Sequence, residues 1–211
     1  MGTGNRPARV DRGGAAADRA GRGAAGGRHA RGGLVRAVPA LVTGAGRGYR
    51  GPVDDPALDL QRAETLEDVH RVLRTAARRL TRADGATFVL LDGDRCYYAD
   101  EDSMSPLWKG QRFPASTCIS GWAMHHRATV VIRDITVDPR IPQEAYRPTF
   151  VRSLVVTPIL DPEPIGALGA YWATLHTATP AEVEALESLA AAAAPALARF
   201  PDGIPSRDFT A

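Results

Sequence analysis

The stretch "CISGWAMHHRATVVIRDITVDPR" (residues 118–140) concentrates reactive side chains next to regular secondary structure. Its first part, "SGWAMHHR" (120–127), predicts a short helix, and "TVVIRDI" (129–135) predicts a strand. A segment punctuated by prolines follows at 136–150, which is typical of a loop. The cysteine, tryptophan and histidines are therefore either a chemical centre or the wall of a pocket beneath a covering loop.

Two amphipathic helices are predicted on either side of this region. The first begins at Thr65, whose side chain can cap the helix, and it shows apolar residues at helical spacing up to Leu80. The second begins at Thr179 with proline and glutamate at favourable positions in the first turn. Pro195 should kink or end this second helix near Ala194.

The remaining regular segments are β-rich and come largely in hairpins, with a turn signal at Asp92-Gly93-Asp94. The predicted strands are 86–91, 95–100, 129–135, 153–160 and 165–173. Strands joined by hairpins, with helices at both ends, indicate an α+β domain with an antiparallel sheet. The two amphipathic helices should share one face of the sheet, and the loop-rich middle should cover the other.

Positive charge is concentrated at the start of the chain. Residues 1–50 carry ten arginines and two aspartates, which leaves a charge of −6 for the rest of a chain of net charge +2. Residues 1–55 are rich in Gly, Ala and Arg, so they are predicted to be a disordered tail. The tail is either an inert extension or a tether to nucleic acid or an anionic membrane; residues 1–33 have no aromatic residues between their arginines, so nucleic-acid binding is not expected.

One motif in this part of the chain resembles a dinucleotide-binding fingerprint. Gly46, Gly48 and Gly51 satisfy the G-x-G-x-x-G spacing. The mechanism requires a helix directly after the glycines, where this chain has Pro52 and Pro56. The sequence therefore does not support dinucleotide binding.

The cysteine content and the hydropathy of the chain bear on the cellular compartment in which the protein is found. The chain has two cysteines, Cys96 and Cys118, which are too few for the disulfide framework of a small secreted domain. No apolar run approaches the length of a membrane span, and no membrane partner is expected. A cytoplasmic location is predicted.

The segments "FPASTCISGWAMHHRATVVIRDITVDPRIPQEAYRPTFVRSLVVTPI" (113–159) and "PIGALGAYWA" (164–173) resemble GAF domains, particularly those attached to bacterial sensor histidine kinases. The resemblance implies a domain over residues 56–200, followed by a short tail at 201–211. It implies a six-stranded antiparallel sheet, so a sixth strand is expected within 101–117. It further implies a non-catalytic sensory role, with a small-molecule ligand and a histidine kinase or another signalling partner. A homodimer through the two terminal helices is predicted from their amphipathic pattern and from the alanine-rich run 190–194.

The subfamily chemistry of GAF domains can be compared residue by residue. The cyclic-nucleotide signature contains asparagine, and this chain has none after Asn5. Covalent bilin attachment at the usual position requires a cysteine in the segment 136–150, where none occurs. In the similar free methionine-sulfoxide reductases a cysteine aligns with Ser120, two positions from Cys118. The cofactor or ligand is therefore left unidentified by the sequence.

The resemblance and the aromatic content together predict an apolar pocket with a few polar groups. The predicted ligand-binding residues are Phe113, Cys118, Trp122, Asp134, Arg140, Tyr146, Phe150 and Trp172. Met124 is assigned to the core. His125 and His126 point about 100° apart on a helix, so no metal site is expected there.

Three alternatives stay open at this point. The supposed pocket is either real or a sealed core in which Asp134 only caps a turn. Cys118 is either a small buried apolar residue or a thiol activated by the start of a helix, which would make the protein a redox sensor or a methionine-sulfoxide-reductase-like enzyme. A dimerisation module with a vestigial pocket is the third possibility.

Overall fold

The computed structural model describes residues 55–203. The predicted N-terminal tail lies outside the described residues except for Asp55, and the same holds for the predicted C-terminal tail except for a 3-10 turn at Pro201–Gly203. Within the described part of the chain, no helix is both long enough and apolar enough to cross a membrane.

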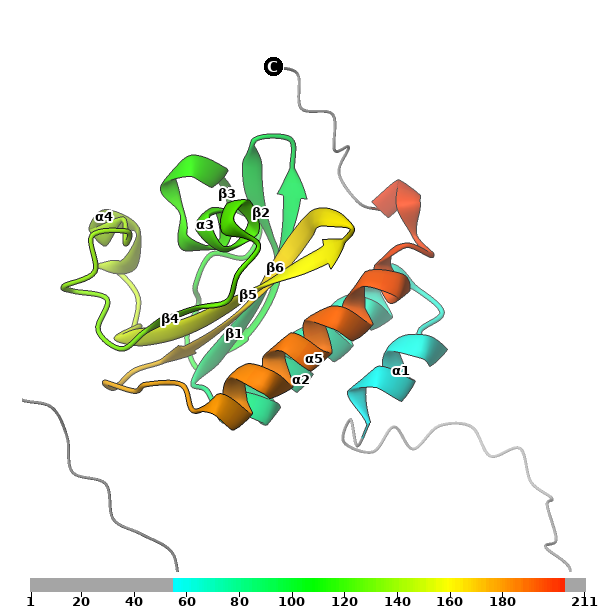
Figure 1. Ribbon diagram of the computed structural model, residues 1–211, viewed down its shortest axis with the longest axis horizontal. Helices are drawn as coiled ribbons and strands as arrows, with labels where there is room; N and C mark the ends of the chain where they lie inside the picture. Colours follow the sequence, from blue (N-terminus) through cyan, green and yellow to red (C-terminus); the bar gives the residue numbers. More distant parts are fainter. Residues whose placement is uncertain (1–54, 204–211) are drawn as a thin grey trace, which may run out of the picture. The chain divides into compact units, whose positions relative to one another are not determined.

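A six-stranded antiparallel sheet forms the centre of the fold (Figure 1). Its strands are β1 (Gly85–Asp92), β2 (Arg95–Ser103), β3 (Arg112–Pro114), β4 (Val130–Ile132), β5 (Ser153–Asp161) and β6 (Glu163–Trp172). Their spatial order is β3-β2-β1-β6-β5-β4. The predicted α+β class and six-stranded sheet are confirmed, and β3 is the short strand expected within 101–117.

The hairpin between β1 and β2 follows from its turn residues. Asp92 pairs with Arg95, which leaves Gly93 and Asp94 as the turn. Gly93 has a φ of 59°, a conformation that glycine adopts without the steric cost that other residues incur. Strand β4 is shorter than the predicted 129–135, because the chain turns at Asp134, whose carboxylate accepts hydrogen bonds from the backbone and side chain of Thr136.

Two helices, α2 (Leu66–Thr81) and α5 (Pro180–Leu197), cover one face of the sheet, and α1 (Pro56–Arg62) packs against both of them. Figure 1 shows α2 and α5 side by side across this face. Both predicted capping boxes are present, with Thr65 accepting from the Asp68 N–H at 3.1 Å and Thr179 from the Glu182 N–H at 3.3 Å. Helix α1 was missed, since seven residues with Leu60 as the buried one give no periodic pattern.

Pro195 was predicted to kink or end α5 near Ala194; it does not end the helix, which continues to Leu197. Proline lacks the N–H that would bond to the carbonyl of Ala191. Ala191 and Pro195 are both exposed, so water can bond to that carbonyl instead. The proline therefore removes one backbone hydrogen bond from the last turns of the helix, where few such bonds remain to be formed.

The opposite face of the sheet is covered by α3 (Ile119–His126), α4 (Gln143–Tyr146) and the loops around them (Figure 1). A 3-10 turn, Ala115–Thr117, precedes α3. The segment 136–150 is mostly loop, as predicted, but it contains the single-turn helix α4.

Alternation along the strands divides the buried residues into two cores. On β1, Phe88 and Leu90 face the helices α2 and α5, whereas Val89 and Leu91 face α3 and its loops. Successive side chains of a strand point to opposite faces, so a central strand covered on both sides is apolar throughout. The sheet thus separates a helical core from a second core that contains the candidate site.

Helix α3 is held close to the preceding turn at Gly121. A β-carbon at this position would overlap the backbone carbonyl of Ala115. Only glycine allows this approach, which places the start of α3 against the turn that leads into it.

We expect Gly121→Ala to destabilise the protein by about 1–3 kcal/mol or more, because the added methyl group meets backbone that cannot move away independently. Chemical denaturation followed by circular dichroism measures the loss. Ser116→Ala, at an exposed position of the same turn, is the matched control. Equal stability of Gly121→Ala and the wild type would contradict the close packing described here.

Candidate functional site

A small cavity of about 50 Å³ lies between the sheet, α3 and the covering segment. Its lining residues are Tyr98, Trp108, Phe113, Thr117, Cys118, Pro142, Ala145 and Tyr146. They come from β2, the β2–β3 loop, β3, the start of α3 and the segment around α4. Segments widely separated in sequence therefore meet at one place on the loop-covered face.

Trp108 links two of these segments. The Glu101 carboxylate accepts hydrogen bonds from the backbone N–H groups of Leu107, Trp108 and Lys109, at 3.0, 2.9 and 3.0 Å. These bonds fix the β2–β3 loop, from which the indole N–H of Trp108 donates to the carbonyl of Ala145 at 3.1 Å. The indole thus fastens α4 over the cavity.

The aromatic rings form a continuous wall. The Trp108 ring centroid lies 5.4 Å from that of Tyr98 and 4.9 Å from that of Tyr146. Phe113 meets Tyr98 edge-on at 5.6 Å. Tilted and edge-on contacts of this kind add to the stability gained from burying the rings themselves.

Three buried tyrosine hydroxyl groups differ in how they are satisfied. The Tyr171 hydroxyl is 2.9 Å from the hydroxyl of Thr87, and the Tyr98 hydroxyl is 3.4 Å from that of Ser120. The Tyr146 hydroxyl has no hydrogen-bond partner among the described residues. Burial raises the pKa of Tyr98 and of Tyr146 well above the usual value, so both keep their protons and can donate.

The chemistry and size of the cavity restrict what it can hold. None of its lining residues is an aspartate, glutamate, lysine, arginine or histidine. A volume of about 50 Å³ is far below the roughly 300–1,000 Å³ of a site for a drug-sized ligand. The cavity as it stands fits a small uncharged group that can accept a hydrogen bond.

Phe113, Cys118 and Tyr146 are the predicted site residues that the structure brings together around this cavity. The sequence analysis missed Tyr98, Trp108, Thr117, Pro142 and Ala145. Strand alternation could have found Tyr98, which shares a face with Cys96 two positions earlier. Trp108 lies in the segment 101–117, from which the sequence analysis assigned only Phe113 to the site.

Trp122 and Arg140 are not among the residues that line the cavity, and they contact each other instead. The Trp122 ring stacks on that of His126 with centroids 4.1 Å apart, and the Arg140 guanidinium lies 4.8 Å from the Trp122 ring centre. Asp138 holds Arg140 through hydrogen bonds of 2.9 and 2.6 Å. Trp122 was predicted as a pocket wall; in the structure its ring contacts His126 and Arg140 and so links the segment 136–150 to α3. Met124 is buried in the core, as expected.

Asp134, Phe150 and Trp172 are not placed at the cavity either. Asp134 caps a turn and lies 3.5 Å from Arg152, and its hydrogen bonds from Thr136 lower its pKa. The Phe150 ring packs against Gly85. Trp172 belongs to the helical core, because it alternates with Tyr171, and it is Tyr171 that faces the cavity side.

Cys96 and Cys118 are both buried and both free. Hydrogen bonding with the Cys96 thiol lowers the pKa of Cys118, and burial opposes the shift. The Cys118 side chain makes no capping hydrogen bond of regular geometry. The nearby backbone N–H groups of Gly121 and Ser120 nevertheless lower its pKa, because they stabilise the thiolate. The pKa of Cys96 is strongly raised by the same interaction and by burial.

A second cluster of titratable groups lies on the helical side of the sheet. Within residues 55–203, Glu67, His70 and Asp100 place potential metal-ligand atoms within 4.8 Å of one another. Asp100 is already ion-paired with Arg74 and, at 2.6 Å, with Lys109. A metal ion would have to compete with these two cations, so the cluster is better explained as an ion-pair network.

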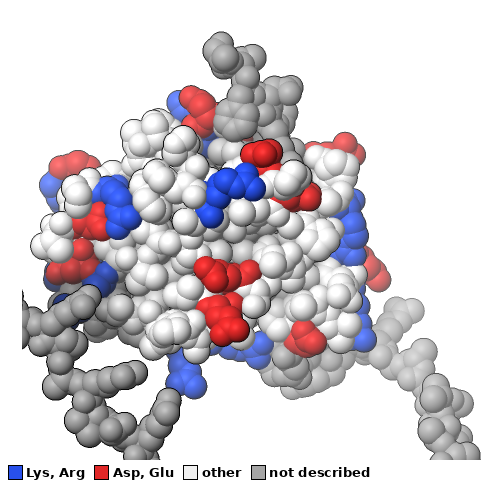
Figure 2. Space-filling model, viewed as in Figure 1, with Lys and Arg blue, Asp and Glu red and all other residues white. Residues whose placement is uncertain are grey.

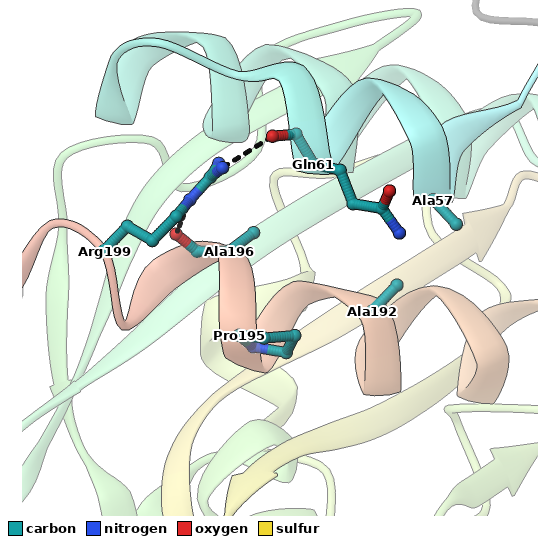
Figure 3. A pocket seen from close by; sticks show the side chains of 6 residues that line it. All are labelled: Ala57, Gln61, Ala192, Pro195, Ala196 and Arg199. Atoms are coloured by element: carbon teal, nitrogen blue, oxygen red, sulfur yellow. Dashed lines mark hydrogen bonds between the residues drawn. The ribbon is translucent and has the colours of Figure 1, made fainter.

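A larger groove of about 260 Å³ follows the seam between α1 and α5 (Figure 3). Ala57, Ala192, Pro195 and Ala196 line it with small apolar groups. The guanidinium of Arg199 bonds to the carbonyls of Gln61, Leu60 and Ala63 at 2.6, 2.7 and 3.1 Å, which satisfies the end of α1. The groove is thus a helix–helix seam, and its charged residue already has a structural role.

Charge is dispersed on the face of the molecule seen in Figure 1. Figure 2 shows basic and acidic side chains interspersed there, with broad uncharged areas between them. A surface that binds nucleic acid usually presents a continuous basic patch. This face therefore lacks the electrostatic footprint of a nucleic-acid interface.

Comparison with known proteins adds to this geometry. A GAF domain family model matches residues 63–198. Among solved structures, the GAF domain of a phosphoenolpyruvate-protein phosphotransferase from Acinetobacter is similar with a TM-score of 0.60 at 15% identity, over 68% of this chain and 89% of that chain. The GAF-B domain of DevS from Mycobacterium smegmatis gives 0.52 at 21% identity, over 69% and 96%.

A third similar structure belongs to an enzyme. The type II free methionine-R-sulfoxide reductase from Thermoplasma acidophilum has a TM-score of 0.52 at 17% identity, over 64% of this chain and 95% of that chain. At these identities the likeness to solved structures shows the fold alone. No curated protein matches the chain.

The His70 environment predicts a dependence of stability on pH. Burial lowers the pKa of His70 from 6.5, and Arg74 and Lys109 lower it further, while Glu67 opposes the shift. The unfolded chain therefore binds more protons than the folded one at mildly acidic pH, and the free energy of unfolding should fall as pH drops through about 6.5. Urea denaturation between about pH 7 and pH 5 measures this slope.

His70→Gln should flatten that slope, since the titrating group is gone. His125→Gln removes an exposed imidazole while leaving His70 in place, and it is the matched control. An unchanged slope in His70→Gln would show that other groups cause the dependence.

Proposed function

The chain belongs to the GAF domain family, and on this premise we propose that it is a non-catalytic sensory module that binds a small molecule in the aromatic cavity beneath α4. GAF domains typically bind ligands in sensory roles. The ligand is proposed to be small, uncharged and able to accept a hydrogen bond. We assign the protein to the cytoplasm and to signal transduction, with a histidine kinase or a similar output protein as its partner.

The observation that carries this proposal is the buried and unpartnered hydroxyl of Tyr146. A buried hydroxyl without a partner costs about 1–3 kcal/mol. Folded proteins keep such groups rarely, and often for a functional reason. Because Tyr146 lines the cavity, a ligand that accepts a hydrogen bond from its hydroxyl would recover that cost on binding.

The contacts around the cavity suggest how occupancy could reach the terminal helices. The Trp108 ring meets that of Tyr171 on β6 at 5.6 Å. The neighbouring Trp172 points to the other face, where its ring lies 4.3 Å from that of His176. His176 bonds at 3.0 Å to Glu182, the capping-box residue of α5. A shift of Trp108 on ligand binding would thus act on the start of α5.

The hydroxyl hypothesis is tested with two tyrosine variants that make the same chemical change. Tyr146→Phe should leave the ligand-free protein as stable as the wild type or more stable, because it removes an unsatisfied buried group. Tyr171→Phe should lose about 1 kcal/mol, because it breaks the bond to Thr87. Thermal and urea denaturation of the ligand-free proteins compare the two.

Ligand binding completes this test. Native mass spectrometry of the purified protein identifies co-purified small molecules, and calorimetry then measures their affinity. Tyr146→Phe should bind roughly threefold to tenfold more weakly, the equivalent of one lost hydrogen bond. Wild-type affinity in Tyr146→Phe would remove this hydroxyl from the site, and a marked loss of stability in the ligand-free variant would show that it is structurally satisfied.

We further propose that the module is a homodimer through its terminal helices. Ala191 and Pro195 are exposed on the outer side of α5, where small side chains permit close approach of a second helix. Dimeric contact through α5 would place the interface at the helix to which the cavity contacts lead. Parallel helices at an interface can then transmit a shift to an attached domain.

Ala191→Arg should produce a monomer, because a charged side chain at the contact would be buried without a partner. Its melting temperature should change little apart from the loss of dimer stabilisation, since Ala191 is exposed in the single chain. Light scattering at micromolar concentration measures the mass. A wild type that is monomeric under these conditions would refute the dimer, and Thr75→Arg on α2 is a control for added charge.

A further inference from the structure

The structure brings the two cysteines of this chain to one place. Cys96 lies in the middle of β2, where its backbone pairs with Leu91 on one side and Phe113 on the other. Cys118 is the N-cap residue of α3. Both side chains belong to the same buried cluster, and each thiol shifts the pKa of the other, although 22 positions separate them in the sequence.

The two thiols differ in their access to a reactant. Cys118 lines the cavity and keeps 8% of its surface exposed. Cys96 has an exposed fraction of 0% and is not among the residues that line the cavity. A molecule that enters the cavity therefore reaches Cys118 first, and Cys96 is in contact with whatever forms on the Cys118 sulfur.

The start of α3 favours negative charge on Cys118. The backbone N–H groups of Ser120 and Gly121 face its sulfur, and helix N-termini stabilise thiolates generally. The thiolate is the nucleophilic form of cysteine. Cys96 has no such surroundings and remains a thiol that can supply a proton.

We propose that Cys96 and Cys118 are a redox-active pair, in which a small hydroperoxide that enters the aromatic cavity oxidises Cys118 and Cys96 then closes an intramolecular disulfide. Three features carry this: the contact between the thiols, the placement of Cys118 alone at the cavity, and the helix start beneath its sulfur.

In the first step the Cys118 thiolate attacks one oxygen of the hydroperoxide. The S–O bond forms as the O–O bond breaks, and the departing alkoxide or hydroxide takes up a proton. Sulfur loses two electrons and the peroxide gains them, giving a sulfenic acid on Cys118 and an alcohol or water.

In the second step the sulfur of Cys96 attacks the sulfenic sulfur. The S–S bond forms, the S–O bond breaks, and the hydroxide leaves with the proton of Cys96 as water. The sum is two thiols and one hydroperoxide giving one disulfide, one alcohol or water, and one water. An added dithiol reductant reverses the oxidation by thiol–disulfide exchange.

The cavity determines which oxidants can react. Its volume of about 50 Å³ admits hydrogen peroxide but not a hydroperoxide with an aromatic substituent. The hydroxyls of Tyr98, Thr117 and Tyr146 also line the cavity and can hydrogen-bond to the peroxide oxygens. The segment between the two cysteines contains Trp108, so a disulfide would close a ring that includes the cavity wall.

This inference does not rest on the proposed sensory function, because the thiol pair would react whether or not another ligand binds. The experiment uses the reduced full-length protein, freed of reductant and treated with hydrogen peroxide under native conditions. After quenching and denaturation, alkylation with N-ethylmaleimide counts the remaining thiols by intact mass. We expect both thiols to be lost together, a mass lower by two hydrogen atoms, a peptide pair linking Cys96 to Cys118, and full recovery with dithiothreitol.

Two variants separate the roles. Cys96→Ser should stop at a sulfenic acid on Cys118 that dimedone traps, whereas Cys118→Ser should leave Cys96 unmodified by the same peroxide treatment. Circular dichroism melts establish that both variants fold. The wild-type thiol count needs no variant, so the proposal remains testable if a substitution prevents folding.

Cumene hydroperoxide is the size control, and it should oxidise the wild type at least about tenfold more slowly than hydrogen peroxide. Equal rates with the two peroxides would overturn the role of the cavity. Two alkylatable thiols after peroxide treatment, or a disulfide only between two chains, would overturn the pair itself.

Discussion

The central strands β1 and β6 are covered on both faces, and the alternation of their side chains holds two different layers in register. On β6, Tyr171 points to the cavity side while Trp172 points to the helices. A slip of one residue would exchange these faces along the whole strand. Both layers therefore depend on the same pairing, and the cavity and the helical face are joined at adjacent residues.

Trp108 carries this constraint from the sheet to the covering segment. Its ring packs on Tyr171 from the central strand β6, and its N–H donates to the carbonyl of Ala145 in α4. The loop that bears it is fixed by the Glu101 carboxylate, which satisfies three consecutive backbone N–H groups. The buried indole of Trp108 therefore contacts the sheet and the segment around α4, and it also lines the cavity between them.

Local interactions were predictable from the sequence, and contacts between distant segments were not. The capping boxes at Thr65 and Thr179 and the turn at Gly93 depend on residues within a few positions, so the helix starts and the first hairpin were confirmed. Trp172 was assigned to the wrong face, because an apolar central strand gives no sign of which side each residue takes. Trp108 was missed, because its burial is created by partners far away in the chain.

The covering segment is fastened more weakly than the sheet beneath it, and this bears on the size of the cavity. The contacts of its central part with the rest of the domain include one indole hydrogen bond, from Trp108, and the Arg140–Trp122 stack. Each contributes on the order of 1 kcal/mol, whereas the sheet is held by many bonds that break together. The position of this segment therefore sets the cavity volume of about 50 Å³ and with it the size of the molecule that reaches Cys118.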